Sequence, residues 1–402
     1  MTAVHDVERP LADIPREFAE VFRAHLGDIA EEMIEEIRAS VPEYSRPSGT
    51  YEHTVRRAVE EALAGFVNRA GDRRVSRGRL LEVYRIIGGG EASEGRPLDS
   101  LQSALRTCAR VAWRRLATES ERLNLSRQHM CDIGEAILVY LDEIAAAAAE
   151  GYAEAQARAA GELELRRRRL LGLLVADPPP DARAVEDLSR SVGWTLPRTV
   201  ACVALAPRRQ GELPRPALPP DVLADLDRPD PCLVVPDPDG PGRQALLHPL
   251  LSDWIVAAGP AVKLGEGAVS LRLAGRALEL TRRGVLGHDT VIRVADHVST
   301  LMIFQDEALI RLMEQTRLAP LRGLRPGRRD RLAETLLAWL QSGYNANEAA
   351  ARLHIHPQTV RYRLRQAVEL FADQLKDPDG RFELEAALRA WALRTQRRDA
   401  RL

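Results

Sequence analysis

Between Arg352 and Arg365 the chain carries a run of hydrogen-bonding side chains and no acidic residue. Glutamine can pair with the edge of adenine and arginine with that of guanine, whereas an arginine beside a phosphate binds it without regard to sequence. Side chains of these types at this density predict contact with double-stranded DNA. The predicted contact residues are Arg352, Pro357, Gln358, Thr359, Arg361, Tyr362, Arg363 and Arg365.

Different roles are expected within this set. The residues expected to read base edges are Gln358, Thr359 and Arg361. Those expected to hold phosphates, and so to position the protein, are Arg352, Arg365 and the arginines of residues 325–331. Tyr362 could instead pack against the protein, and Arg363 could pair with a phosphate or with Glu369.

Two short helices joined by a tight turn are expected to position these side chains, over residues 347–370. Asn347 is predicted to be the first N-cap, because its side chain can accept bonds from the orphan N–H groups of a first turn. His354 to His356 form the predicted turn, and Pro357 suits the first position of the next helix. The predicted apolar faces consist of Ala349, Ala350, Leu353, Val360, Leu364, Ala367, Val368 and Phe371.

This arrangement is typical of a helix-turn-helix whose second helix enters the major groove by its N-terminal half. An ordinary helical hairpin with a solvated arginine face is the first competing interpretation. A metal site at His354 and His356 is the second, but no Cys or carboxylate ligand lies nearby. His5, His129 and Cys131 are equally weak as haem or metal ligands. We therefore predict no metal and no cofactor.

Length and charge narrow the class of protein. A chain of 402 residues has room for two or three domains. The formal net charge is −1, so the basic character is local, which suits a regulator better than a histone-like protein. The four cysteines are scattered and predict free thiols in a reducing cytoplasm. Neither a secretory signal nor a membrane span is predicted, so a cytoplasmic location is expected.

Residues 13–165 are expected to be almost wholly helical. The 3.6-residue periodicity predicts one helix from Ile14 to Ile37, and residues 71–76 suit a turn. Glycines 88–90 are predicted to form a helix C-cap and a loop rather than a nucleotide-binding loop, since they follow a helix.

A long helix is predicted from about Met130 to Leu174, capped by Asn124 or Ser126. Its leucines, Leu163 among them, could pack against a second chain. A helix that leaves one domain and enters the next could also transmit a rotation or shift between them. A plain linker helix is the alternative.

The chain becomes mixed after the prolines at 178–180, and a small α/β domain is expected. Its predicted strands are Thr199–Leu205, Cys232–Val235, Gln244–Leu247 and Trp254–Ala258, and its predicted helix is Val269–Arg283. Residues 206–231 are expected to be loop-like. The acidic residues lie in Pro-rich loops and form no catalytic constellation, so no enzymatic activity is predicted.

Helical structure is expected to return at Val291–Leu318, with a periodic apolar stripe of Val298, Leu301, Met302, Leu309, Leu312 and Met313. A basic hinge at Pro320–Arg329 is followed by a predicted helix at Leu332–Gln341. Asp377–Gly380 reads as a turn, and a last helix at Phe382–Leu393 is expected to add Phe382 to the core. These flanking helices would complete the core of the helix-turn-helix.

Residues 330–393 resemble the C-terminal DNA-binding region of the PucR/CdaR-type bacterial transcriptional regulators. The family's usual string is His-Arg-Asn-Thr-Leu-x-Tyr-Arg, and this chain has His-Pro-Gln-Thr-Val-Arg-Tyr-Arg over 356–363. The departures fall at the head of the recognition helix, which predicts a different base preference on the same fold. Residues 180–295 resemble the degenerate GGDEF-like domain of that family, without its GG[DE]EF string. Residues 13–165 resemble its helical sensor domain, which also occurs in stressosome co-antagonists.

The predicted protein is mainly α: an N-terminal helical bundle, a small α/β middle domain and a C-terminal helix-turn-helix domain. The predicted boundaries are 1–165, 166–180 for the linker, 181–318, 319–329 for the hinge, and 330–402. The resemblance implies a DNA-binding regulator, homodimeric or of higher order, with a small-molecule or protein effector at the N-terminal domain. A helical adaptor that binds a protein partner is the alternative, and a nucleotide-turnover enzyme in the middle domain is a further one.

Overall fold

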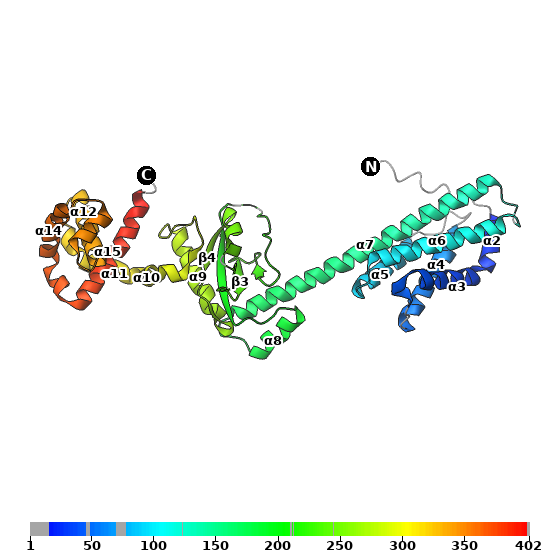
Figure 1. Cartoon of the computed structure of the whole chain (residues 1–402), viewed down its shortest axis with the longest axis horizontal. Helices are drawn as coiled ribbons and strands as arrows, with labels where there is room; N and C mark the ends of the chain where they lie inside the picture. Colours follow the sequence, from blue (N-terminus) through cyan, green and yellow to red (C-terminus); the bar gives the residue numbers. More distant parts are fainter. Residues whose placement is uncertain are drawn as a thin grey trace. The chain divides into compact units, whose positions relative to one another are not determined.

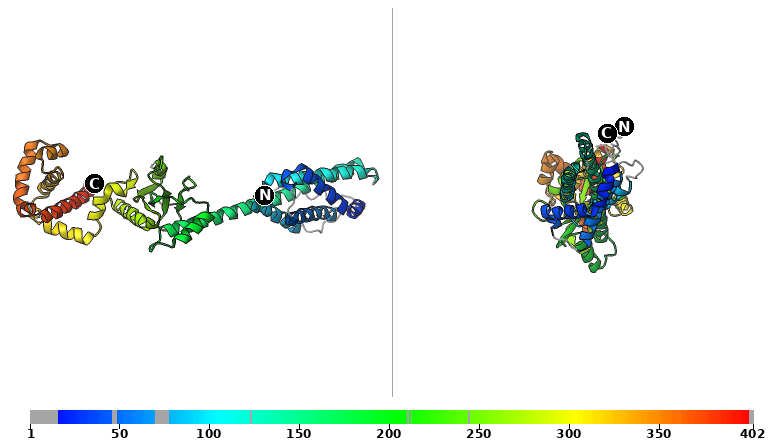
Figure 2. Two further views of the ribbon diagram at one scale, coloured as in Figure 1. Left: turned by 60° about the horizontal axis from the view of Figure 1, so that its bottom comes forward. Right: turned by 90° about the vertical axis from the view of Figure 1, so that its right-hand side faces the viewer.

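The protein is mainly helical, as predicted, with a small mixed sheet in the middle of the chain (Figures 1 and 2). The computed structural model describes residues 16–45, 49–69, 78–122, 124–209, 211, 213–243 and 245–399. The chain divides into two compact units, Met1–Glu164 and Leu165–Leu402. His5, the predicted helix start at Ile14 and the predicted turn at 71–76 lie outside the described residues.

The first unit is a helical bundle. Its helices are α2 (Arg16–Ala24), α3 (Leu26–Ser40), the short η1 (Pro42–Tyr44), α4 (Gly49–Arg69), α5 (Gly78–Ser93), α6 (Leu98–Ser120) and α7 (Arg127–Leu174). The single helix predicted up to Ile37 is broken at His25, which stands between α2 and α3 with a non-helical backbone. Along α3 the buried Ile29, Met33 and Ile37 recur every four residues and face the core.

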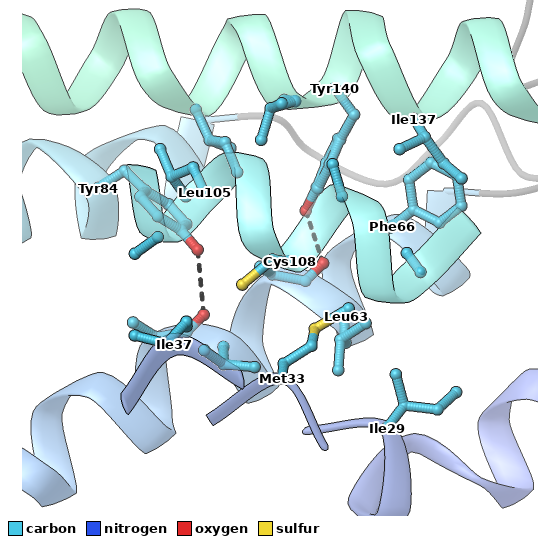
Figure 3. Close-up of a pocket in the computed structure, with 18 of the residues that line it drawn as sticks. Ile29, Met33, Ile37, Leu63, Phe66, Tyr84, Leu105, Cys108, Ile137 and Tyr140 are labelled. Carbon is cyan, nitrogen blue, oxygen red and sulfur yellow. Dashed lines mark hydrogen bonds between the residues drawn. The ribbon is translucent and has the colours of Figure 1, made fainter. Parts of the chain in front are cut away.

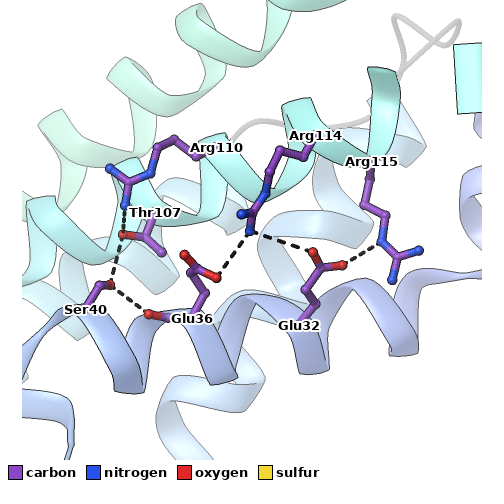
Figure 4. Close-up of polar contacts among 7 residues, drawn as sticks. All are labelled: Glu32, Glu36, Ser40, Thr107, Arg110, Arg114 and Arg115. Atoms are coloured by element: carbon purple, nitrogen blue, oxygen red, sulfur yellow. Dashed lines mark hydrogen bonds and ion pairs between the residues drawn. The ribbon is translucent and has the colours of Figure 1, made fainter. Parts of the chain in front are cut away.

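A polar seam joins α3 to α6 (Figure 4). The guanidinium of Arg115 donates to Glu32 at 2.6 Å, and that of Arg114 donates to Glu36 at 3.2 Å. Ser40 and Thr107 lie within hydrogen-bonding distance at 3.4 Å. These contacts lie at the rim of the bundle and set the register of two helices whose apolar faces meet inside it.

Glycines 88–90 lie inside α5, so the predicted C-cap and loop are wrong. A Cβ built on Gly88 would stand 1.9 Å from the Ala148 carbonyl oxygen, and one on Gly151 would stand 2.0 Å from that of Arg85. The backbones of α5 and α7 therefore touch directly, which only glycine permits. The glycines serve helix packing here and not a turn.

The predicted long helix is confirmed by α7, which runs from Arg127 to Leu174. The Ser126 hydroxyl accepts a bond from the His129 backbone N–H at 3.1 Å, so Ser126 caps the helix as predicted. Near its C-terminus, Leu170 and Leu174 are buried in the core of the second unit. Leu163, in contrast, is exposed.

The middle of the chain forms a six-stranded sheet in the order β2-β3-β1-β4-β6, with β5 paired to β1. The strands are β1 (Thr199–Pro207), β2 (Leu223–Asp225), β3 (Cys232–Pro236), β4 (Trp254–Ala258), β5 (Val262–Lys263) and β6 (Ile292–Arg293). The β4–β6 pair is parallel and the others are antiparallel. Alternate residues of β1 enter different clusters: Ala204 and Ala206 pack with α9 (Gly267–Arg282), while Val203 and Leu205 pack on the opposite face.

Two predictions for this region are wrong. The strand predicted at Gln244–Leu247 is a 3₁₀ helix, η2 (Ala245–Ser252), in its described part. The run Leu246, Leu247, Leu250 is apolar enough for either structure, and periodicity cannot separate the two over so short a stretch. The loop predicted at 206–231 contains β2. A further helix, α8 (Ala182–Ser191), precedes the sheet.

The predicted helix at Val291–Leu318 is divided into η4 (Val294–His297), α10 (Val298–Ile303) and α11 (Glu307–Arg317). Asp306 caps α11 by accepting from two backbone N–H groups, which restarts the helix in a new register. The apolar residues of the predicted stripe therefore do not form one buried face. Val298, Met302, Leu309 and Leu312 are exposed, whereas Leu301 and Ile310 are buried.

The C-terminal part is helical. Its elements are η5 (Ala319–Leu321), α12 (Pro326–Gln341), α13 (Ala346–Leu353), α14 (Pro357–Lys376) and α15 (Pro378–Asp399). The turn predicted at Asp377–Gly380 is instead the start of α15, where an Asp377 carboxylate oxygen accepts from the Gly380 N–H at 2.7 Å. Phe382 was predicted to be in the core, but it is 70% exposed. Leu384 and Leu388, which lie four residues apart on α15, are buried instead.

Candidate nucleic-acid interface

The first helix of the pair, α13, is capped by Asn345 and not by Asn347 as predicted. The Asn345 side-chain oxygen accepts from the backbone N–H groups of Asn347 at 3.0 Å and Glu348 at 3.4 Å. The spacing Asn345 to Glu348 is that of a capping box, and this signal could have identified the correct cap from the sequence. Asn347 is thereby released for a different contact.

The turn between the helices contains two histidines in different roles. His354 ends α13 in the left-handed conformation, with φ 52° and ψ 40°. His356 caps α14, because its Nδ1 accepts from the Gln358 backbone N–H at 3.2 Å. Pro357 follows at the first position of α14, as predicted. The turn therefore fixes where α14 begins and which way its first residues face.

Small buried residues bring α13 close to its neighbours. Ala349, Ala350, Val360 and Leu364 form one cluster with Ala338 of α12. The predicted apolar face of α14 is confirmed at Val360, Leu364, Ala367 and Phe371, which are all buried. It is wrong at Val368, which is exposed.

Most of the predicted contact residues are exposed. Arg352, Gln358, Thr359, Arg361, Tyr362 and Arg365 are exposed, and Pro357 and Arg363 are partly buried. On α14, Gln358, Arg361, Tyr362 and Arg365 stand at i, i+3, i+4 and i+7, so they form one stripe on a single face. The possibility that Tyr362 packs inside is wrong, since its side chain is 57% exposed.

Two arginines of α14 make contacts within the domain. One Arg361 Nη donates to the Asn347 side-chain oxygen at 3.0 Å, which links the first turn of α14 to α13. One Arg363 Nη donates to the Thr335 hydroxyl at 3.5 Å, so this side chain turns toward α12 rather than toward Glu369. A guanidinium has five N–H donors, and a single contact to Asn347 orients Arg361 without using them all.

The arginines at the start of α12 lie beside α14. Arg328 donates to the Gln366 side-chain oxygen at 3.0 Å, so the first turn of α12 is held against the second half of α14. Arg325 and Arg331 are exposed, whereas Arg329 is paired with Asp330 at 3.3 Å. Positive charge therefore extends from the stripe on α14 onto a second helix.

Two acidic residues of the middle domain, Asp221 and Asp237, have structural partners. Arg243 hydrogen-bonds the Asp221 carboxylate and lowers the pKa of Asp221 below its ordinary value. Asp237 accepts from the backbone N–H groups of Arg198 and Thr199 at 3.0 and 3.1 Å. Across the described ranges, no group of three His, Cys, Asp or Glu side chains could hold a metal ion.

Two family models match the chain. Residues 11–175 match the PucR-like N-terminal domain. Residues 332–390 match the PucR C-terminal helix-turn-helix domain. The predicted family resemblance is thereby confirmed at both ends of the chain, while the GGDEF-like resemblance of the middle stays a prediction.

One stretch of 58 residues is 41% identical to the purine catabolism regulatory protein of Bacillus subtilis (strain 168). It makes up 14% of this chain and 11% of that relative, so the chain spans a small part of the relative's length. The crystal structure of a regulator of polyketide synthase expression from Bifidobacterium adolescentis is 18% identical and has a TM-score of 0.28. That likeness covers 58% of this chain and 99% of the other, and at this TM-score it carries no argument. No described helix is both long and apolar enough to cross a membrane.

Proposed function

The chain belongs to the PucR family of regulators, and we propose that it binds double-stranded DNA in a sequence-specific manner under the control of its upstream domains. The observation that carries this proposal is the exposed, acid-free stripe on the first half of α14. The stripe directly follows a turn in which His354 ends α13 and His356 caps α14. A helix presented by its N-terminal half suits the major groove.

Gln358, Thr359 and Arg361 are the residues that we expect to read base edges. The bond between Arg361 and Asn347 supports this role, because it fixes the guanidinium before DNA arrives and so reduces the entropy lost on binding. Gln358 is the first exposed side chain of α14 and suits adenine. Pro357 contributes through the position it gives to α14.

Arg352, Arg365 and the arginines at the start of α12 are expected to hold phosphates. Arg328 is the best supported of the α12 set, since its bond to Gln366 places it beside α14. Arg363 is partly buried and turns toward Thr335, which leaves it less accessible to a phosphate than the exposed Arg352 and Arg365. These contacts would set affinity and salt dependence rather than sequence.

Selection of bound duplexes from a random library tests the proposal. Wild-type protein should enrich a defined sequence and bind it less tightly as salt rises. Arg361→Ala should lose preference at one base position, at a cost of about 1–3 kcal/mol. Arg183→Ala, which removes an exposed arginine of α8 in the middle domain, is the matched control. It should leave the base preference and the affinity for DNA unchanged.

Two results would contradict these roles. A uniform loss of affinity across all sequences in Arg361→Ala would make Arg361 a phosphate contact. Wild-type protein that fails to bind any duplex even at low salt would refute DNA binding itself.

Two copies on a palindromic site are the expected binding unit, because a single helix-turn-helix offers little surface for specific affinity. Footprinting on the selected site, with sedimentation of the complex, tests this expectation. Protection of one half-site by a monomer at full affinity would contradict it. A cytoplasmic location, an effector at the N-terminal domain and the domain limits given above belong to the same proposal.

A further inference from the structure

The N-terminal bundle contains a partly open cavity of about 130 Å³ (Figure 3). Its wall draws on α3, α4, α5, α6 and α7, with Met33, Phe66, Tyr84, Cys108 and Tyr140 pointing toward one space from five helices (Figure 3). The surface of the wall is almost entirely apolar. The cavity lies within the residues that match the PucR-like N-terminal domain, to which the proposed function assigns the effector.

The polar groups at this wall are already bonded to the protein. The Tyr84 hydroxyl donates to the Ala58 carbonyl oxygen at 3.2 Å, and that of Tyr140 donates to the Ala62 carbonyl oxygen at 2.8 Å. Burial raises the pKa of the Cys108 thiol to about 12, so the thiol is neutral at physiological pH. The two tyrosine hydroxyls and the Cys108 thiol therefore offer no counter-charge to a charged ligand.

Glu91 is the one ionisable carboxyl among the described residues that line the cavity. It accepts a bond from the Tyr44 hydroxyl at 3.1 Å and another from the Arg96 guanidinium at 2.8 Å. The Arg96 guanidinium therefore already pairs with the Glu91 carboxylate. A charged ligand in the apolar part of the cavity would lose its hydration without gaining a partner, which is strongly unfavourable.

We propose that this cavity binds an uncharged, apolar small molecule of about the size of benzene. A cavity of about 150 Å³ lined by Leu, Ile and Phe stays dry and binds benzene, so the volume and lining seen here fit that class of ligand. Its role as the effector of a regulator rests on the proposed function. The binding itself does not depend on it.

The position of the cavity suits an effector. Ile137, Tyr140 and Ile144 of α7 line it, and the same helix continues to Leu170 and Leu174 in the core of the second unit. Tyr140 also bonds the backbone of α4, so a ligand beside its ring would press on two helices at once. A ligand that favours one arrangement of α7 would shift the protein toward it.

Titration calorimetry of the full chain with benzene tests the proposal. One molecule per chain should bind saturably, and at a tenfold excess over Kd the midpoint of thermal unfolding of the N-terminal unit should rise by about 3–6 °C. Cys108→Phe places a ring in the space and should weaken benzene binding roughly tenfold or more. Cys131→Phe, the same change at an exposed cysteine of α7, should bind as the wild type does.

Cys108→Leu, a smaller filling that the bundle accepts more easily, should weaken binding less than Cys108→Phe in a chain with unchanged circular dichroism. Absence of saturable benzene binding in the wild type would overturn the proposal, and so would equal binding by both Cys108 variants and the wild type. A mobility shift on selected duplexes, run on the same preparations, separates this outcome from failure of the proposed function. If the chain binds benzene but no DNA, the proposed function is refuted and the proposal of a ligand cavity stands.

Discussion

The two ends of the chain bury their side chains in different ways. The C-terminal helices close on one another through small residues and fully buried large ones, such as Ala349, Leu336 and Phe371. The N-terminal bundle presses two backbones together at Gly88 and leaves a cavity of about 130 Å³ elsewhere. The first core fixes the position of a surface stripe, whereas the second retains space. The proposed DNA contacts would need one fixed geometry, whereas the proposed ligand would need room.

The largest expected effect compares one leucine from each core. Leu336→Ala in α12 removes a fully buried side chain with neighbours on all sides, and we expect a loss of about 4–5 kcal/mol. Leu105→Ala in α6 removes a side chain at the cavity wall, which has fewer contacts to lose, so about 3 kcal/mol is expected. Amide hydrogen exchange on the full chain measures the local free energy of each unit. Equal losses would mean that the cavity is closed in solution.

The second prediction concerns the close approach of α5 and α7. Gly88→Ala forces a methyl group against the Ala148 carbonyl oxygen, so the helices must separate, and we expect the N-terminal unit to lose about 1–3 kcal/mol. Gly90→Ala is the matched control in the same helix, where nothing lies within 4 Å of a Cβ. It should instead stabilise that unit by about 0.5–1 kcal/mol. Thermal unfolding of both variants measures the difference, and the same sign for both would refute the close contact.

The third prediction tests the turn of the helix-turn-helix. His354 is exposed and left-handed, a conformation that glycine adopts without strain, so His354→Gly should stabilise the C-terminal domain by about 1 kcal/mol. DNA affinity should not change. His356→Ala has the opposite expected sign, because it removes the acceptor for the Gln358 N–H at the start of α14. Urea unfolding of the two variants decides, and destabilisation by His354→Gly would show that the imidazole has a contact of its own.

The sequence predicts helices whose start residues act locally, such as caps and prolines. It does not predict features that depend on which other helix packs against a segment. Pro357 and Ser126 start helices whatever surrounds them, so α14 and α7 were placed correctly. Gly88 was read as a helix end, because a sequence does not reveal a second backbone that crosses there. The cavity was not predictable, since it arises from the absence of atoms among residues that all look like ordinary core.

The same limit applies to the candidate interface. The stripe on α14 could be read from i, i+3, i+4 and i+7 spacing, and its exposure agrees with that reading. Asn347 was taken for a cap although it bonds Arg361, a residue 14 positions away that only the folded turn brings near. Periodicity alone predicts Val368 and Phe382 in the core, but both side chains are exposed.

The smallest expected effect lies where the C-terminal core meets the middle domain, on α11 and α15. Burial raises the pKa of Glu314 above its ordinary value, although the guanidiniums of Arg394 and Arg311 act in the opposite direction. The folded state therefore holds the Glu314 proton more tightly than the unfolded state does. Its contribution to stability is full below the ordinary pKa of a glutamate and is lost as pH rises through the raised value.

Glu314→Gln should consequently flatten the pH dependence of α11 and α15 in hydrogen exchange above the ordinary pKa of a glutamate, because glutamine does not titrate. The control is Glu383→Gln, which breaks the neighbouring pair with Arg317 at a carboxylate on the same pair of helices. This variant should keep the pH dependence of hydrogen exchange that Glu314 causes in α11 and α15. If Glu314→Gln keeps the wild-type slope, the buried carboxyl of Glu314 is not the source of that slope, and another titrating group must account for it.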